Sequence, residues 1–189
     1  MSVPREPDPA LLFLSIFARE WDVFWSGLQA RLEERFGPLA YCSEPFPFDE
    51  THYYATEFGE PLSRRVLGFA RYVPQESLPD IKLATNALET DWSDRNGHRL
   101  FNLDPGLLTL ERLVLATGKN FGHRIYLGRG IWADLTLVFS KGAWQVLPWT
   151  FPDYAGSRMQ EHLNRLRELY HTRRKAKHPS DKEMPCPEA

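Results

Sequence analysis

Residues 102–136 read NLDPGLLTLERLVLATGKNFGHRIYLGRGIWADLT, and the predicted fold is built outward from this stretch. Its apolar runs have the length of strands, and charged side chains lie among them. These side chains are Asp104, Lys119, His123, Arg124 and Asp134. Polar groups packed between buried strands cost free energy unless the protein or a ligand pairs them. The stretch is therefore predicted to hold a functional site, but it does not identify a reaction.

Hydrophobic periodicity upstream of this stretch predicts alternating strands and helices. Residues 11–18, 39–44 and 62–73 have the pattern of strands, whereas residues 21–36 and 74–92 have helical spacing. With a further strand at 99–103, the order is strand, helix, strand, strand, helix, strand. This order predicts an α+β protein whose first part is a ferredoxin-like βαββαβ unit.

Further antiparallel strands and a C-terminal helix are predicted to extend this first part. The sequence Asp104-Pro105-Gly106 is typical of a turn, and residues 107–117 fit either a strand or a short helix capped by Thr109. The later strands are predicted at 124–127, 131–139 and 144–149.

A single α+β domain is predicted over residues 1–172. Its last helix carries apolar residues at helical spacing up to about His171. Residues 173–189 are rich in charge and proline, which predicts a disordered tail.

The composition restricts the class of protein. A hydrophobic fraction of 42% indicates a substantial core, and the net charge of -2 provides no overall basic field for RNA. Two cysteines without a CxxC pair exclude a zinc ribbon and fit a reducing compartment. Because no apolar run has the length of a membrane span or signal peptide, we predict a cytoplasmic protein that does not enter the membrane.

The segment GKNFGHR, residues 118–124, is the most specific candidate for ligand binding. Two glycines allow a ligand to approach the backbone, and Lys119 and Arg124 are donors suited to anions. His123 can act as an acid or base near neutral pH. The segment lacks the rest of a phosphate-binding P-loop, and no metal-ligand spacing is present. The alternative is a hairpin whose basic residues neutralise nearby carboxylates.

Other candidates come from the strand at 131–140, the helix at 74–92 and the aromatic loop at 45–61. In the strand, alternation places Asp134 and Thr136 opposite a face formed by Ile131, Ala133, Leu135, Leu137 and Phe139. In the helix, Lys82, Asn86 and Glu89 share one side, which is also the pattern of an ordinary solvated face. The loop contributes Tyr54, although its aromatic residues more commonly cover a core.

Longer motifs resemble a known family. The run NLDPGLLTLERLVLATGKNFGHRIYLGRGIWADLTL followed by LPWTFPDY resembles the uncharacterised bacterial family called domain of unknown function 4416. The segments SEPFPFDETHYYATEFG and IKLATNALE are similar to upstream motifs of that family. The resemblance covers residues 11–154, and Gly118 departs from the family's LATTKN motif. It implies a bacterial cytoplasmic protein and brings no activity, cofactor or fold with it.

Two functions from different classes follow as hypotheses. The first is a site for an anionic, nucleotide or phosphate-bearing small molecule, in which His123 or Asp134 would be the acid or base of any catalysis. Its ligand-binding residues are predicted to be Asp104, Lys119, Arg124, Tyr54, Lys82 and Asn86. The second is a non-catalytic module that binds RNA or a protein across an open sheet face, through Tyr126, Trp132 and Trp144. A third possibility, a structural partner in a complex, requires the loop at 45–58 to be exposed.

Overall fold

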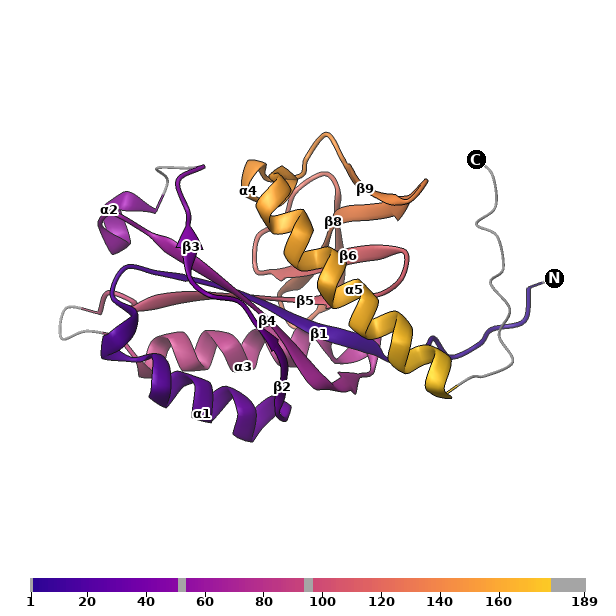
Figure 1. Cartoon of the computed structure of the whole chain (residues 1–189), viewed down its shortest axis with the longest axis horizontal. Coiled ribbons are helices and arrows are strands. Elements are labelled where there is room, and N and C mark those ends of the chain that lie inside the picture. Colours follow the sequence, from indigo (N-terminus) through magenta and orange to yellow (C-terminus); the bar gives the residue numbers. More distant parts are fainter. Residues whose placement is uncertain (1, 51–53, 94–96, 178–189) are drawn as a thin grey trace.

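Nine strands form one antiparallel sheet in the computed structural model, which describes residues 2–50, 54–93 and 97–177 (Figure 1). The strands are β1 (Ala10–Ala18), β2 (Leu39–Cys42), β3 (Phe46–Pro47), β4 (Ser63–Val73), β5 (Phe101–Leu108), β6 (Arg112–Thr117), β7 (Arg124–Gly128), β8 (Ile131–Ser140) and β9 (Ala143–Val146). Their order is β2-β4-β1-β5-β6-β8-β7, with β3 beside β4 and β9 beside β8. The α+β class and the additional antiparallel strands are confirmed.

Helices cover both faces of the sheet (Figure 1). They are α1 (Trp25–Phe36), α2 (Ala55–Phe58), α3 (Leu78–Asp91), α4 (Pro152–Ala155) and α5 (Ser157–Lys177), with the 3-10 turns η1 (Trp21–Val23) and η2 (Gln75–Ser77). The helices α1 and α3 share one face, called here the α3 face, and α5 crosses the other, called the α5 face. The first helix ends as predicted at Gly37, which has a φ of 94° and donates its amide to the carbonyl of Glu33.

Strand β1 is buried on both sides because it lies at the centre of the sheet. Its residues Leu12, Leu14 and Ile16 pack on the α3 face, whereas Leu11 and Phe13 pack beneath α5. Each such buried side chain contributes about 1.5–3 kcal/mol. Close packing of α5 needs a glycine in β4, since a Cβ at Gly68 would lie 2.3 Å from the side chain of Leu166.

The prediction of a turn at Asp104-Pro105-Gly106 is wrong, because β5 continues through these residues to Leu108. The open side of β5 accommodates the proline. Leu103 directs its amide and carbonyl away from β1, and alternation places Pro105 on the same unpaired side, so the missing N–H costs no ladder bond. Gly106 is required by packing, since a Cβ there would lie 2.7 Å from the carbonyl oxygen of Val114.

The predicted faces of β8 are also corrected. Strand β6 pairs Leu113 with Leu137 but Val114 with Leu135, so Thr136 forms a bulge. As a result Leu137 packs beneath α5, while Ile131 packs on the α3 face. Strict alternation cannot reveal a bulge, because the bulge depends on the pairing with β6.

The remaining differences concern element ends. Residues 107–117 form the end of β5 and β6, not a helix, and the last strand ends at Val146. Helix α5 continues to Lys177, so residues 173–177 of the predicted tail are helical. Residues 178–189 of that tail lie outside the described residues, as do residues 51–53 of the aromatic loop.

Candidate functional site

Polar side chains form three groups, which are defined here by their residues. The dyad cluster contains Lys119, His123, Arg124, Asp134 and Trp149. The Arg64 centre contains Ser15, Arg64, Asp153 and Tyr154. The edge network contains Glu57, Lys82, Glu89, Arg99, Asn102 and Asp104.

The dyad cluster is organised around the buried carboxylate of Asp134, whose exposed fraction is 3%. Strand pairing places Arg124 of β7 opposite Asp134 of β8. Arg124 Nε donates to Asp134 Oδ2 at 2.8 Å, and His123 Nε2 lies 3.2 Å from the same oxygen. The carboxylate therefore fixes both a guanidinium and an imidazole at the outer edge of the sheet.

Trp149 completes the cluster and is a residue that the sequence did not identify. Its indole ring stacks on the imidazole of His123, with ring centroids 5.0 Å apart and an angle of 8° between the planes. The indole Nε1 donates to the carbonyl of Leu135 at 2.8 Å, which holds the ring against β8. His123 is thus restrained by stacking as well as by Asp134.

The outward side of the dyad cluster is only slightly exposed: 10% of the His123 side chain and 9% of the Arg124 side chain are accessible to solvent. His123 Nδ1 has no hydrogen-bond partner among the described residues, and Arg124 uses Nη1 to bind the carbonyl of Lys119 at 3.0 Å. A Cβ at Gly118 or Gly122 would meet no atom within 4 Å. The loop between β6 and β7 therefore has open space at its two glycines.

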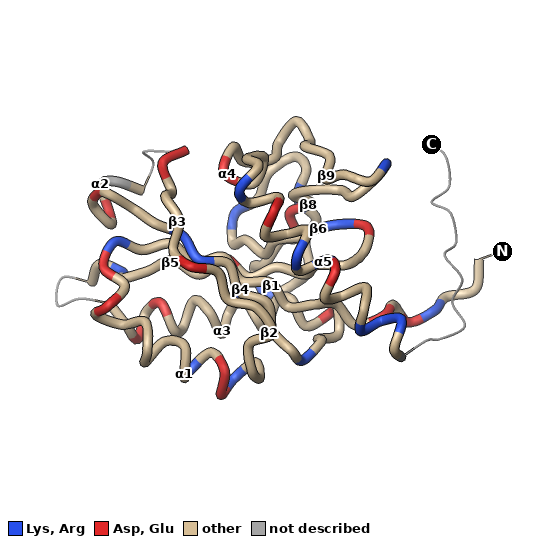
Figure 2. The backbone as a smooth tube through the Cα atoms, viewed as in Figure 1, with Lys and Arg blue, Asp and Glu red and all other residues tan. Residues whose placement is uncertain are grey.

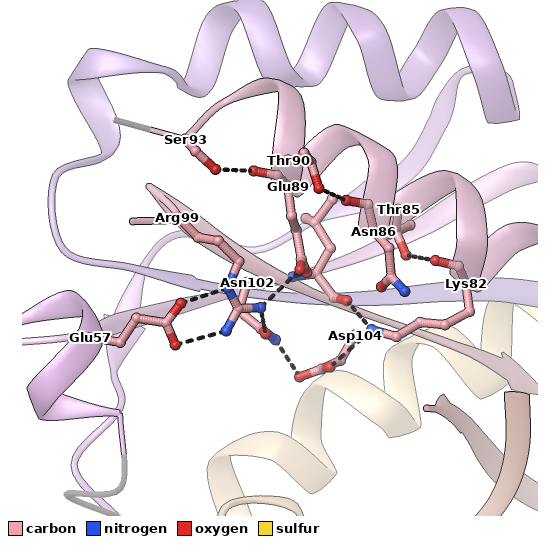
Figure 3. A network of polar contacts seen from close by, with 11 residues as sticks. Glu57, Lys82, Thr85, Asn86, Glu89, Thr90, Ser93, Arg99, Asn102 and Asp104 are labelled. Carbon is pink, nitrogen blue, oxygen red and sulfur yellow. Dashed lines mark hydrogen bonds and ion pairs between the residues drawn. The ribbon is translucent and has the colours of Figure 1, made fainter. Parts of the chain in front are cut away.

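The edge network closes the unpaired edge of β5, as Figure 3 shows. Strand β6 pairs with β5 only from Gly106 to Leu108, so none of the described strands lies beside Leu103 on that side. Instead, Lys82 Nζ donates to the Leu103 carbonyl at 2.9 Å, and the Leu103 amide donates to Glu89. These two side chains of α3 take the place of a neighbouring strand, which gives Lys82 and Glu89 a structural role.

Arg99 connects this edge to the surface (Figure 3). It forms a bidentate pair with Glu57 at 2.7 and 2.9 Å and also donates to Glu89 at 2.8 Å. The bonds from Arg99 lower the pKa of Glu57, whereas burial raises the pKa of Glu89. Asn102 accepts a hydrogen bond from Arg99 and donates one to Asp104. Lys82 Nζ lies 3.7 Å from the Asp104 carboxylate.

The Arg64 centre lies on the α5 face of β1 and β4. Arg64 has an exposed fraction of 2% and pairs with Asp153 at 2.6 Å. Its guanidinium lies 4.1 Å from the ring centroid of Phe48 and 5.3 Å from that of Tyr154. Burial raises the pKa of Tyr154, so its hydroxyl stays protonated at neutral pH. The sequence did not identify Arg64, because a charged residue within a strand usually marks a solvated face.

The three groups are connected. Asp104 pairs with Ser15 across β1 and β5, and its charge acts on both Arg64 and Tyr154. On the other side, segment 149–154 joins Trp149 of the dyad cluster to Asp153 and Tyr154 of the Arg64 centre. Its Thr150 hydroxyl donates to the carbonyl of Thr136 at 2.6 Å. The three groups therefore form a continuous row of polar side chains along the α5 face. Side chains of α3 contact this row at the unpaired edge of β5.

The predicted site residues divide among these groups. The structure brings together Lys119, His123, Arg124 and Asp134 in one group, and Asp104 and Lys82 in another. Asn86 lies beside Lys82 on α3 without joining the drawn contacts by its side chain (Figure 3). Tyr54 is separate: its ring packs 4.5 Å from that of Phe17, in an apolar group with Phe48 and Phe58.

Charge is unevenly divided along the chain. Positions of both signs are spread over the fold (Figure 2), but residues 112–151 contain five Lys or Arg residues and a single acidic one, Asp134. This segment forms β6 to β9 and carries the dyad cluster. It is net positive within a chain of net charge -2.

Two further features bear on the kind of site. Within residues 2–50, 54–93 and 97–177, no group of three or more His, Cys, Asp or Glu side chains has a geometry that could hold a metal ion. No helix in the same part of the chain is long and apolar enough to cross a membrane.

Comparisons with known proteins identify the family. No curated protein and no solved structure matches the chain. A family model does match, over residues 8–170, which include the dyad cluster, the Arg64 centre and the edge network. The chain therefore belongs to the family described as domain of unknown function (DUF4416).

Proposed function

We propose that the protein binds an anionic, phosphate-bearing small molecule at the dyad cluster, where His123 serves as an acid or base. The observation that carries this proposal is the restraint of His123 between Asp134 and Trp149 with Nδ1 directed to neither. A histidine that served only to neutralise Asp134 would not need a second contact that fixes its ring plane.

The chemistry follows from the hydrogen-bond roles. When Nε2–H donates to Asp134, Nδ1 carries the lone pair and accepts a proton from a bound molecule. The Asp134 carboxylate then stabilises the imidazolium, as an aspartate does beside the histidine of a hydrolytic triad. Arg124 and the net positive segment 112–151 provide the field for the anionic group.

Phosphate binding tests this proposal directly. Inorganic phosphate and nucleoside monophosphates are titrated into the protein while its thermal unfolding is followed. A ligand at 100 times its dissociation constant raises the free energy of unfolding by about 2.7 kcal/mol. We expect stabilisation of the unmodified protein and its loss in Arg124→Gln, which removes the guanidinium but retains a polar side chain.

A matched control uses Arg129→Gln. Arg129 lies in the same positive segment, but it is exposed and pairs with Asp80 of α3. Equal loss of stabilisation in both variants would show that phosphate responds to the general charge and not to the dyad cluster. Equal stabilisation of the unmodified protein and Arg124→Gln would refute the proposed site.

A second candidate is binding of a protein at β7, the outermost strand of the sheet. Ile125 and Tyr126 of β7 are more than half exposed, and Phe121 before the strand is exposed as well. An edge strand with consecutive exposed apolar residues is suited to pair with another chain. Trp144 cannot contribute, since it is 5% exposed. Cross-linking and sedimentation with Ile125→Lys as the control variant would detect such binding.

The observations give less support to the third possibility. In the aromatic loop, Phe48 and Phe58 are buried around Phe17, so the described part of that loop is not an apolar surface patch.

We also propose the finer fold and location that the sequence suggested. The antiparallel order β2-β4-β1-β5, with α1 and α3 on one face, supports a ferredoxin-like first part. The family resemblance and the free thiol of Cys42 support a bacterial cytoplasmic protein. Fractionation of the native host would test the location.

A further inference from the structure

Most of the exposed large apolar side chains lie in one part of the chain. Among the described residues nine such side chains are exposed, and seven of them belong to residues 121–151. They are Phe121, Ile125, Tyr126, Leu127, Val146, Trp149 and Phe151. Strands β7 and β9, which carry four of them, follow one another along the side of β8 that faces away from β6. A run of three such residues in the outermost strand, β7, indicates a surface that another chain covers.

The backbone of β7 presents hydrogen-bonding groups on its outer side. The Arg124 amide donates to the carbonyl of Phe121 and therefore does not point to β8. Alternation along an antiparallel pair then directs the amide and carbonyl of Ile125 to β8, where Ala133 lies opposite, and those of Tyr126 outward. The outer side thus offers the Arg124 carbonyl as an acceptor and the Tyr126 amide as a donor.

The opposite edge of the sheet is protected, unlike β7. Strand β2 has four residues, and the first three are half-buried. The amide of Leu39 donates to Glu33 Oε1 at 3.3 Å, and the Tyr41 hydroxyl lies 2.7 Å from Nδ1 of His162 in α5. Proteins usually protect edge strands in such ways because an open edge pairs with other chains. The open edge at β7 is therefore a specific feature of this fold.

The chemistry of β7 suits a second copy of the same strand. Its charged residue, Arg124, is paired with Asp134, so two copies can meet without bringing unbalanced charges together. An antiparallel pair centred on Ile125 places this residue, which is 69% exposed, opposite its counterpart in the second copy. The same alignment places the Tyr126 amide of each copy against the Arg124 carbonyl of the other. Apolar contact and backbone hydrogen bonds are thus satisfied by one symmetric arrangement.

We infer that two copies of the protein associate through β7, in a symmetric antiparallel pairing centred on Ile125 that joins their sheets. The inference rests on the second candidate function, binding of a protein at β7, and names the partner as a second copy of this chain. It does not depend on anion binding at the dyad cluster. Because β7 has only five residues, the interface is small, and the expected dissociation constant is on the order of 10 µM.

Sedimentation velocity of the purified protein, from about 1 to about 200 µM, measures this association. The unmodified protein should pass from monomer to dimer over that range. Ile125→Lys and Ile125→Glu each place two like charges opposite one another and remove the apolar contact, so each alone should weaken the dimer about tenfold or more. An equimolar mixture of the two variants should recover the dimer, because opposite charges then meet at the centre of the pairing.

Val23→Lys is the matched control, since Val23 of η1 is 66% exposed and lies outside this edge. It should leave the association unchanged. Because Ile125 is exposed, its substitutions should keep the fold intact, which thermal unfolding checks. A monomer at every concentration overturns the inference, as does a mixture that associates no more strongly than either Ile125 variant alone.

The failure of self-pairing can be distinguished from the failure of the other proposals. If the purified protein is a monomer but Ile125→Lys abolishes cross-linking to a different protein, self-pairing is overturned and the second candidate function stands. Phosphate titration reports separately on the dyad cluster, because Ile125 belongs to none of the three polar groups.

Discussion

The Arg64 centre and the dyad cluster each pair an arginine with an aspartate, yet they leave their spare donors in opposite surroundings. Arg64 and Asp153 lie 2.6 Å apart in the interior, where two guanidinium nitrogens have no partner among the described residues. Arg124 and Asp134 lie 2.8 Å apart at the edge of the sheet, where the guanidinium also binds a backbone carbonyl and its side chain is 9% exposed, with no nitrogen buried without a partner among the described residues.

The two arginine–aspartate pairs should therefore have different roles. Solvent can satisfy the spare donors of Arg124 until a ligand replaces it, so the dyad cluster is stable when empty. In the part of the chain that the structure describes, the spare donors of Arg64 have no such substitute. The Arg64 centre should therefore dominate stability, and the dyad cluster should dominate the response to anions.

Removal of Asp153 should have the largest effect. Asp153→Ala leaves the buried guanidinium of Arg64 without its countercharge, which typically costs about 3–5 kcal/mol. Urea denaturation measures the loss. Asp80→Ala, which breaks the exposed pair with Arg129, is the control and should cost about 0–1 kcal/mol. Similar losses in the two variants would show that the buried pair of Arg64 with Asp153 contributes no more to stability than the exposed pair of Arg129 with Asp80.

Lys82→Met should have the next largest effect. It leaves the Leu103 carbonyl without its donor, and a buried group that loses its partner costs about 1–3 kcal/mol. Because Lys82 belongs to the edge network, phosphate affinity should stay within twofold of that of the unmodified protein. A large loss of phosphate affinity with unchanged stability would instead move Lys82 into the anion site.

His123→Ala should have the opposite effect to Lys82→Met: a small loss of stability and a large loss of activity. It removes a stacking contact with Trp149 and one hydrogen bond, so the free energy of unfolding should fall by only about 1–2 kcal/mol. Any turnover of a phosphate ester should be lost, and its pH profile should lose the limb that reports the acid or base. His98→Ala, a change at another histidine, serves as the control for general effects. Retained turnover in His123→Ala would remove His123 from catalysis.

Glu57→Gln should produce the smallest effect, visible only in acid. Bonds from Arg99 lower the pKa of Glu57 below its ordinary value of 4.5 in the folded protein. The carboxylate therefore contributes stability above pH 4.5, and this contribution is lost as the pH falls through the lower folded pKa. In Glu57→Gln the decline of stability below pH 4.5 should be shallower. Unfolding midpoints measured between pH 3 and pH 6 test the slope, with Glu34→Gln as an exposed control.

Sequence patterns predicted the features that depend on local chemistry. The buried strand β1 and the helix end at Gly37 follow from apolar runs and from the conformational freedom of glycine. His123, Arg124 and Asp134 lie together because β7, which begins directly after His123, forms a hairpin with β8. Pairing between strands that are adjacent in the sequence can be predicted from their order in the chain.

The features that the sequence did not predict depend on distant partners. The strand through Pro105 requires an unpaired edge, and the bulge at Thr136 requires the register with β6. Arg64 meets Asp153 only because α4 returns to β4 across the sheet. Trp149 stacks on His123 through a similar return. The hydrophobic periodicity of a single segment cannot predict such contacts between distant segments.

The short ladder between β5 and β6 has a consequence for hydrogen exchange. Only Gly106, Leu107 and Leu108 of β5 pair with β6, and β7, β8 and β9 are joined to the sheet through β6. Apart from this ladder, that part of the sheet is held mainly by apolar packing under α5. Opening at these three residue pairs would detach β6 to β9 from the rest of the sheet, and the ladders within this part would then open together once its packing under α5 is lost. Deuterium should therefore enter β6 to β9 as one cooperative unit, ahead of β1 and β4.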